Sequence, residues 1–105
     1  MLQPDVTWAG GLTEMTKICA LASAYDIPVI PHHGVAASAH LIASQSMTTC
    51  PMQEYLIQHG TRGQFFHLHP VVPERGSIAL PDRPGIGIEL DQSKIEGSRE
   101  VKPAG

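Results

Sequence analysis

The first 57 residues alternate short apolar stretches with stretches of helical periodicity, and this alternation limits the possible folds more than any other feature. Residues 27–31 form an apolar run with β-branched side chains, short enough for a buried parallel strand that begins near Pro28. Residues 35–47 predict a helix, and residues 54–57 predict another short strand. This order of elements is typical of βαβ units, so we expect an α/β fold with a parallel sheet and right-handed crossovers.

A further helix is expected after the glycine pair at residues 10 and 11. Thr13 is a plausible N-cap, and Glu14 falls in the first turn, where an acidic side chain suits the helix dipole. Two βα units do not close a fold, because open strand edges and an uncovered apolar face remain. The apolar residues expected on one face of this helix are Leu12, Met15, Ile18, Cys19, Ala22 and Tyr25.

The composition changes after residue 57. Residues 58–105 contain seven glycines and five prolines, which favour loops and short strands over helices. We therefore expect three parts: βα units at 1–57, strands and loops at 58–91, and a frayed polar tail at 92–105. Charged residues make up 16% of the chain, against about 25% in an average soluble domain. This composition suits part of a larger protein.

Charge and hydropathy exclude several classes of protein. The net charge of −3 gives no basic surface for nucleic acid, so no nucleic-acid partner is expected. No apolar run reaches 18 residues, which argues against a membrane span, and the first residues lack the basic and apolar regions of a signal peptide. Two cysteines make no disulfide framework and are expected as reduced thiols of a cytoplasmic protein.

Asp5 and His32 are the first candidates for catalysis. Each follows a proline at the end of an apolar stretch, and they lie one βα unit apart. In a parallel barrel, adjacent strands place such residues side by side at the C-terminal rim, where active sites form. A carboxylate that accepts the Nδ1 proton of a histidine produces a general base next to a substrate carboxylate or carbonyl. The alternative is that Asp5 and His32 have separate structural roles.

The other candidates carry weaker signals. Glu54 could lie on the same rim and donate a hydrogen bond to an oxyanion when protonated, or it could be a surface acid. His33 either lines the mouth of a pocket or is exposed. His67 and His69 could form half a zinc site, but no CxxC or HExxH accompanies them, so solvated loop residues are the simpler interpretation and no metal ligand is assigned.

Several segments resemble the enolase superfamily, specifically its mandelate racemase/muconate lactonizing enzyme group. The resemblance covers residues 2–91 and is carried by segments 2–6, 10–14, 29–32 and 84–90. These resemble, in order, the end of strand seven, the start of helix seven, the histidine of strand eight and the C-terminal return to a capping domain. Within the group, the Gln-Pro-Asp-Val segment with Trp8 and the Val-Ile-Pro-His segment most resemble the L-rhamnonate dehydratases.

This resemblance implies the C-terminal part of a modified TIM barrel and an Mg²⁺-dependent lyase. Enzymes of this kind abstract the proton α to a sugar-acid carboxylate and then eliminate water, a scheme that belongs to the superfamily as a whole. His32 resembles the base, Asp5 its dyad partner and Glu54 the acid that stabilises the enolate. The implied substrate is an acid sugar such as L-rhamnonate, which His33 would help to bind, and the intact parent would be a homo-oligomer.

The sequence also departs from that family. His33 stands where the residue after the base is usually glycine, and Ala9 stands where cysteine often occurs. The three carboxylates that hold Mg²⁺ in this family come from earlier strands, so they would lie outside this chain. The alternatives are therefore a non-catalytic truncated remnant, or part of a racemase or of a dehydratase for another acid sugar.

Overall fold

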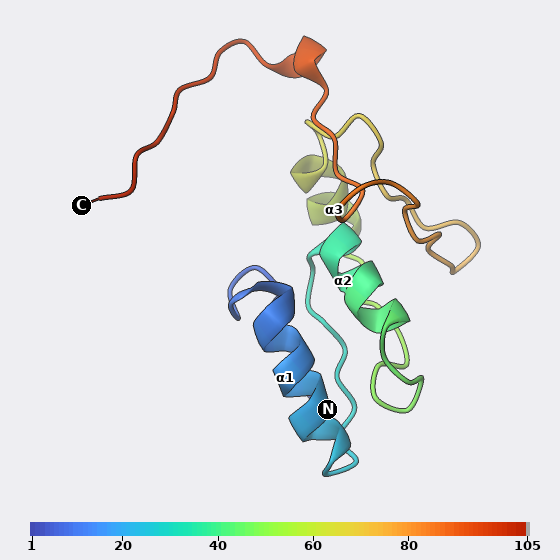
Figure 1. Cartoon of the computed structure of the whole chain (residues 1–105). Helices are drawn as coiled ribbons and strands as arrows, with labels where there is room; N and C mark the ends of the chain where they lie inside the picture. Colours follow the sequence, from blue (N-terminus) through green and yellow to red (C-terminus); the bar gives the residue numbers. More distant parts are fainter. Residues whose placement is uncertain (105) are drawn as a thin grey trace.

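The structure is a computed structural model that describes residues 1–104. Helices α1 and α2 are in contact, and extended segments run beside them (Figure 1). Across the described residues, no helix is long and apolar enough to span a membrane. The helical elements are α1 (Gly11–Ser23), α2 (Val35–Ala43), α3 (Ile57–Gly63) and the short 3₁₀ helix η1 (Gln92–Lys94).

Two extended segments, one before α1 in the sequence and one after it, pair with each other in parallel. Leu2 pairs with Val29 and Asp5 pairs with His32, and the N–H of His32 donates a 3.0 Å hydrogen bond to the carbonyl of Pro4. The two segments and α1 make one βαβ unit, which confirms the predicted α/β character and the parallel pairing. The pairing consists of isolated bridges, so residues 1–104 contain the beginning of a sheet and not a closed barrel.

The strand predicted at residues 54–57 is wrong. Residues 51–56 have no regular secondary structure, and Ile57 begins α3. Gly60 lies so close to Tyr55 that a Cβ on this glycine would be 2.8 Å from the tyrosine ring. Periodicity alone cannot assign so short an apolar run to a strand or a helix, so the sequence did not predict the start of α3 at Ile57. The helix begins at residue 57 and lies mostly in the part of the chain where few helical stretches are expected.

Helix α1 begins two residues earlier than its predicted cap. The N-cap residue is Gly10, at φ 102°, and no side chain caps the helix, so the prediction of Thr13 is wrong. A glycine suits this position because L side chains rarely adopt such a positive φ. Tyr25 lies beyond the helix and is 71% exposed, so it does not share the apolar face. The buried residues of that face are Met15, Cys19 and Ala22, as predicted.

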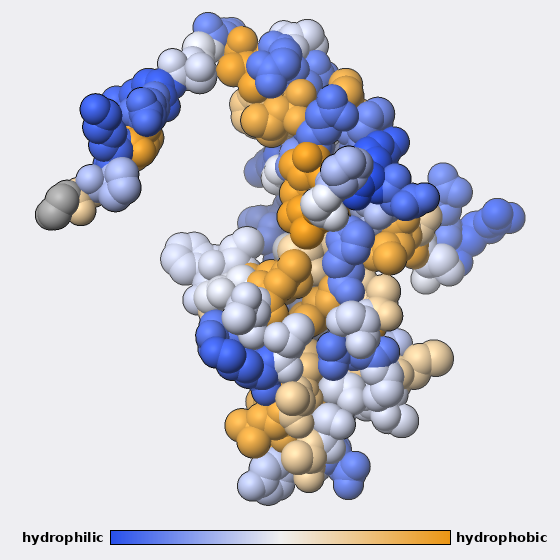
Figure 2. Space-filling model, viewed as in Figure 1, coloured by the Kyte–Doolittle hydropathy of each residue, from blue (hydrophilic) through white to orange (hydrophobic). Residues whose placement is uncertain are grey.

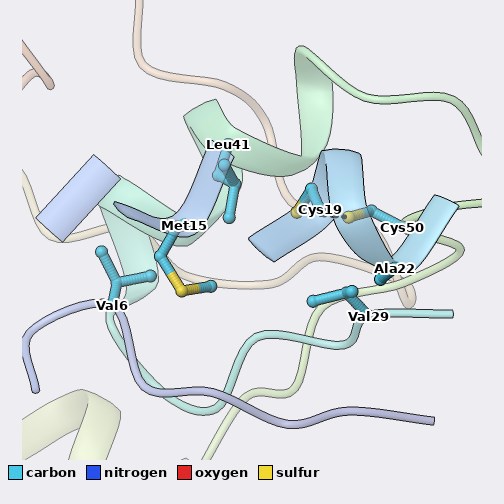
Figure 3. Close-up of a cluster of buried hydrophobic side chains, with 7 residues drawn as sticks. All are labelled: Val6, Met15, Cys19, Ala22, Val29, Leu41 and Cys50. Atoms are coloured by element: carbon cyan, nitrogen blue, oxygen red, sulfur yellow. Dashed lines mark hydrogen bonds between the residues drawn. The ribbon is translucent and has the colours of Figure 1, made fainter. Parts of the chain in front are cut away.

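The core is small and lies between α1, α2 and the paired segments (Figure 3). Cys19 and Cys50 meet in it as free thiols, with their sulfur atoms 3.7 Å apart. The backbone N–H of Val29 donates to the carbonyl of Thr49 at 2.8 Å, which brings the segment after α2 to the same core. Its buried residues are Val6, Met15, Cys19, Ala22, Val29, Leu41 and Cys50.

The second part of the chain adds little to this core. It contains the isolated antiparallel pairs His67–Leu90 and Glu74–Ser77, and residues 95–104 have no regular secondary structure and extend away from the rest (Figure 1). The predicted tail differs at its start, where η1 occupies residues 92–94. Apolar residues lie among polar ones on the visible surface (Figure 2). Trp8, Met47, Ile57 and Val101 are each at least 77% exposed.

Candidate active site

The parallel pairing brings Asp5 and His32 next to each other. They face one another across the bridge between the two extended segments, each directly after a proline. Because parallel strands run in one direction, both residues stand at the same end of the small sheet. The predicted placement of Asp5 beside His32 is therefore confirmed at the level of the backbone.

Glu54 reaches the same end of the sheet from the segment between α2 and α3. Its Oε2 atom is hydrogen-bonded to Nδ1 of His32. The segment is held in place by Gln53, whose side-chain amide donates a 2.8 Å hydrogen bond to the carbonyl of Val35 at the start of α2. The three residues proposed from the sequence thus gather in one place, although residues 54–57 are not a strand.

The Asp5 carboxylate is held by residues of its own turn. Its Oδ1 atom accepts hydrogen bonds from the backbone N–H of Thr7 at 2.7 Å, from the Thr7 hydroxyl and from the N–H of Trp8 at 3.3 Å. The expected hydrogen bond between Asp5 and Nδ1 of His32 is not formed, because Glu54 occupies that nitrogen. The sequence analysis missed Thr7, although an Asp followed two residues later by Thr favours such a turn.

The surroundings of Asp5 favour its ionised form. Burial raises the pKa of the Asp5 carboxyl, but the hydrogen bonds from Thr7 and Trp8 lower it more, and His32 lowers it slightly further. The net result is a pKa below the ordinary value. Asp5 therefore carries a negative charge next to His32 at neutral pH.

The contact with Glu54 sets the state of the imidazole. An ionised carboxylate only accepts hydrogen bonds, so Nδ1 of His32 must carry a proton. In the neutral ring, Nε2 is then the nitrogen with a free electron pair, and it can remove a proton from a substrate. The side chains of His32 and Glu54 are 43% and 30% exposed, so further protein is needed to exclude water from this site.

His33 lies between this site and a neighbouring cavity. Its φ of 57° falls in the left-handed region that favours glycine, and Ser38 donates a 2.6 Å hydrogen bond to its carbonyl. Its ring centre is 6.4 Å from that of His32 and 6.2 Å from that of His59. It lines a cavity of about 240 Å³ together with His59 and other residues. Of the two placements left open by the sequence, His33 therefore lines a pocket.

Of the remaining histidines, His67 lines the same cavity as His33, and His40 and His69 lie elsewhere. His69 is 3.8 Å from an oxygen of Glu89 and is not part of a cluster with His32. His40 was expected to be a hydrogen-bonded packing residue, but its buried Nε2 atom has no hydrogen-bond partner within residues 1–104. That part of the prediction is therefore wrong.

The residues of this chain do not fit a magnesium site. Mg²⁺ is held by carboxylate oxygens, but within residues 1–104 no group of three His, Cys, Asp or Glu side chains could hold a metal ion. The two nearby carboxylates are engaged otherwise, since Asp5 Oδ1 accepts three hydrogen bonds and Glu54 contacts His32. That Mg²⁺ ligands would lie outside this chain stays a prediction.

The fold and these residues agree with a family of enzymes. A model of the family described as enolase C-terminal domain-like matches residues 1–94, and the chain belongs to this family. This match confirms the enolase superfamily expected from the sequence.

Within this family, the chain is similar to L-rhamnonate dehydratases. The chain is 38% identical over 101 residues to a putative L-rhamnonate dehydratase of Caldivirga maquilingensis. The aligned region covers 90% of this chain and 25% of that protein. It is 35% identical over 97 residues to an L-rhamnonate dehydratase of Saccharopolyspora erythraea, with 87% and 24% covered. The crystal structure of L-rhamnonate dehydratase from Gibberella zeae matches with a TM-score of 0.71 and 38% identity, over 87% of this chain and 25% of that one. The chain thus spans about a quarter of the length of these relatives.

Proposed function

We propose that this chain is the C-terminal part of the modified TIM barrel of an acid-sugar dehydratase, with His32 as the catalytic base. The observation that carries the proposal is the hydrogen bond between His32 and Glu54 next to Asp5. It supports a neutral imidazole with its free electron pair on Nε2, at the end of the sheet where barrel enzymes carry their active sites. The similarity to L-rhamnonate dehydratases supports an acid sugar such as L-rhamnonate as substrate.

The proposed reaction has two steps. In the first, the C2–H bond of the sugar acid breaks, the proton moves to Nε2 of His32 and the electron pair passes into the carboxylate to give an enediolate. In the second, the C3–O bond breaks and His32 returns the proton to the departing hydroxyl, so that water leaves. The enol that remains becomes a 2-keto-3-deoxy acid. A bound Mg²⁺ would stabilise negative charge on the substrate, and we propose that its ligands lie outside this chain.

The proposed roles of the acids differ. Glu54 keeps Nδ1 of His32 protonated, and its stabilisation of the enolate remains a proposal that needs it to be released from this contact. Asp5 supplies negative charge next to the imidazolium that forms in the first step. His33 lines the adjacent cavity and is proposed to contact the substrate. We further propose a homo-oligomeric, cytoplasmic parent enzyme.

A chimera tests the proposed function. Residues 1–94 would replace the matching C-terminal quarter of the Gibberella zeae enzyme, which supplies the rest of a barrel. With Mg²⁺ and L-rhamnonate, we expect formation of a 2-keto-3-deoxy acid, and other acid sugars in the same assay define the substrate range. A folded chimera that exchanges the C2 proton without losing water would indicate a racemase.

A non-catalytic remnant is the second candidate. It is favoured by exposed apolar side chains such as Trp8, which is 90% exposed. An incomplete sheet with an apolar surface is expected to associate with itself. Sedimentation of the isolated chain tests this association: a soluble monomer with cooperative unfolding would contradict it.

A further inference from the structure

In the turn that follows Asp5, three hydrogen-bond donors converge on one oxygen of its carboxylate. Thr7 directs two donors, its backbone N–H and its hydroxyl, at the same oxygen of Asp5, and the N–H of Trp8 adds a third. Within residues 1–104, every hydrogen bond that reaches the Asp5 side chain ends on Oδ1. The second oxygen, Oδ2, is therefore left for a partner outside the turn.

The backbone of the same turn is also fixed on Asp5. The carbonyl of Asp5 accepts hydrogen bonds from the backbone N–H groups of Trp8 at 3.2 Å and Ala9 at 2.8 Å. On the other side, Asp5 pairs with His32, whose N–H donates to the carbonyl of Pro4. With the backbone held on both sides, the carboxylate keeps only its two side-chain torsions. Three donors on one oxygen restrict both torsions, so the direction of Oδ2 depends on Thr7.

We propose that Thr7 is a positioning residue, which fixes the Asp5 carboxylate so that its negative charge stays beside His32 during proton transfer. This inference deepens the proposed function and rests on it, since a positioned carboxylate matters only if His32 gains and loses a proton. Thr7 does not touch the reacting atoms in this account. Its hydroxyl acts through Asp5, which stabilises the imidazolium form of His32.

The alternative is that Thr7 only stabilises the turn. Aspartate and threonine commonly form such local hydrogen bonds at the ends of strands, with no role in chemistry. The two explanations make different predictions, because a stabiliser of the turn changes only stability and the titration of Asp5, whereas a positioning residue also changes the rate and pH profile of proton exchange by His32. Thr7 is exposed, so replacing it removes no core contact.

The first test uses the isolated chain and three variants. Thr7→Val removes the hydroxyl with nearly the same shape, Thr7→Ser keeps it, and Thr16→Val makes the same change at an exposed threonine whose hydroxyl bonds to the carbonyl of Thr13. The titration of the Asp5 carboxyl carbon is followed by NMR. We expect a higher midpoint in Thr7→Val and the original midpoint in Thr7→Ser and Thr16→Val. Equal midpoints in the original chain and Thr7→Val would overturn the proposal.

The second test places the same variants in the chimera. We expect Thr7→Val to lower the rate of C2 proton exchange roughly 10-fold and to change its pH profile, with KM unchanged and with rescue by Thr7→Ser. A loss in Thr7→Ser as large as that in Thr7→Val would overturn the role of the hydroxyl. The NMR titration does not depend on catalysis. If the chimera shows no exchange but Thr7→Val still raises the titration midpoint of Asp5 in the isolated chain, the proposed dehydratase function is rejected and the role of the hydrogen bond is not.

Discussion

The Nδ1 atom of His32 is hydrogen-bonded to Oε2 of Glu54, 22 residues further along the chain. This one contact joins the end of a paired segment to a stretch without regular structure, and it determines which imidazole nitrogen can accept a proton. Asp5 lies beside the same histidine but directs its carboxylate to Thr7 and Trp8. The candidate site therefore contains one imidazole between two carboxylates with different tasks.

Replacing Glu54 with glutamine should change the protonation pattern of His32. In the original chain we expect the neutral ring to carry its proton on Nδ1, because the Glu54 carboxylate can only accept a hydrogen bond. A glutamine side chain offers both an acceptor and a donor, so Glu54→Gln should give a mixture of the two neutral forms. Nitrogen-15 NMR of the imidazole distinguishes them.

The matched control for this variant is Glu89→Gln, which changes an exposed glutamate 3.8 Å from His69. It should leave the His32 signals as they are. A proton on Nε2 of His32 in the original chain at neutral pH would contradict the assignment of Nε2 as the basic nitrogen.

The contribution of Asp5 to stability should depend on pH. The folded state lowers the pKa of Asp5 below its ordinary value of 3.8, so its contribution is present above that value and is lost as the pH falls through the lowered one. At pH 7, Asp5→Asn should reduce the free energy of unfolding by on the order of 1 kcal/mol, because an amide oxygen accepts the turn hydrogen bonds less strongly than a carboxylate.

Urea unfolding at a series of pH values measures this difference. The gap between the original chain and Asp5→Asn should close at the acidic end of the series. The exposed Asp82, changed to asparagine, serves as the control and should show no such pH-dependent gap. A gap that stays constant across the series would mean that the charge of Asp5 contributes nothing to folding.

A methyl group on Gly34 should destabilise the turn that carries His32 and His33. Gly34 has a φ of 67°, and a Cβ there would lie 3.0 Å from the hydroxyl of Ser38. The left-handed conformation alone costs a non-glycine residue roughly 1–2 kcal/mol. Thermal unfolding of Gly34→Ala should show at least this loss.

Two other glycines separate the contributions to that loss. Gly11 has a φ of 80° but no atom within 4 Å of an added Cβ, so Gly11→Ala should show the strain without the crowding. Gly97 has neither feature, and Gly97→Ala should be neutral. Equal unfolding temperatures for all three variants would contradict this account of the turn.

The buried thiols should be unreactive while the chain is folded. Burial, together with the nearby thiol of Cys19, raises the pKa of Cys50 to about 12 from an ordinary value of 9.0. The thiolate is the form that reacts with iodoacetamide, so labelling at pH 8 should be slow in the folded chain and fast in guanidinium chloride. The thiol form favours folding below pH 9.0, and this contribution should be lost as the pH rises towards 12. Rapid labelling of the folded chain would contradict the burial of this pair.

The sequence allowed the pairing of Asp5 with His32 to be predicted, because each follows a proline at the end of an apolar stretch one βα unit from the other. The contact of Glu54 with His32 could not be predicted from the sequence. The segment that carries Glu54 is held in place by a hydrogen bond from the Gln53 side chain to a backbone carbonyl. Such a long-range contact leaves no periodic signal. Thr13 was a reasonable cap by residue type, but the observed N-cap is Gly10, whose positive φ ends the preceding turn three residues before the predicted cap.

The most direct test of the account is exchange of the C2 proton of L-rhamnonate with deuterated water in the chimera that carries residues 1–94. His32→Asn removes the basic nitrogen but keeps a similar volume, and we expect it to slow exchange by at least about 100-fold with folding intact. His69→Asn, at a histidine that lies near Glu89 and away from His32, is the matched control and should leave the exchange rate unchanged. Retention of the full exchange rate in a folded His32→Asn chimera would show that His32 is not the base.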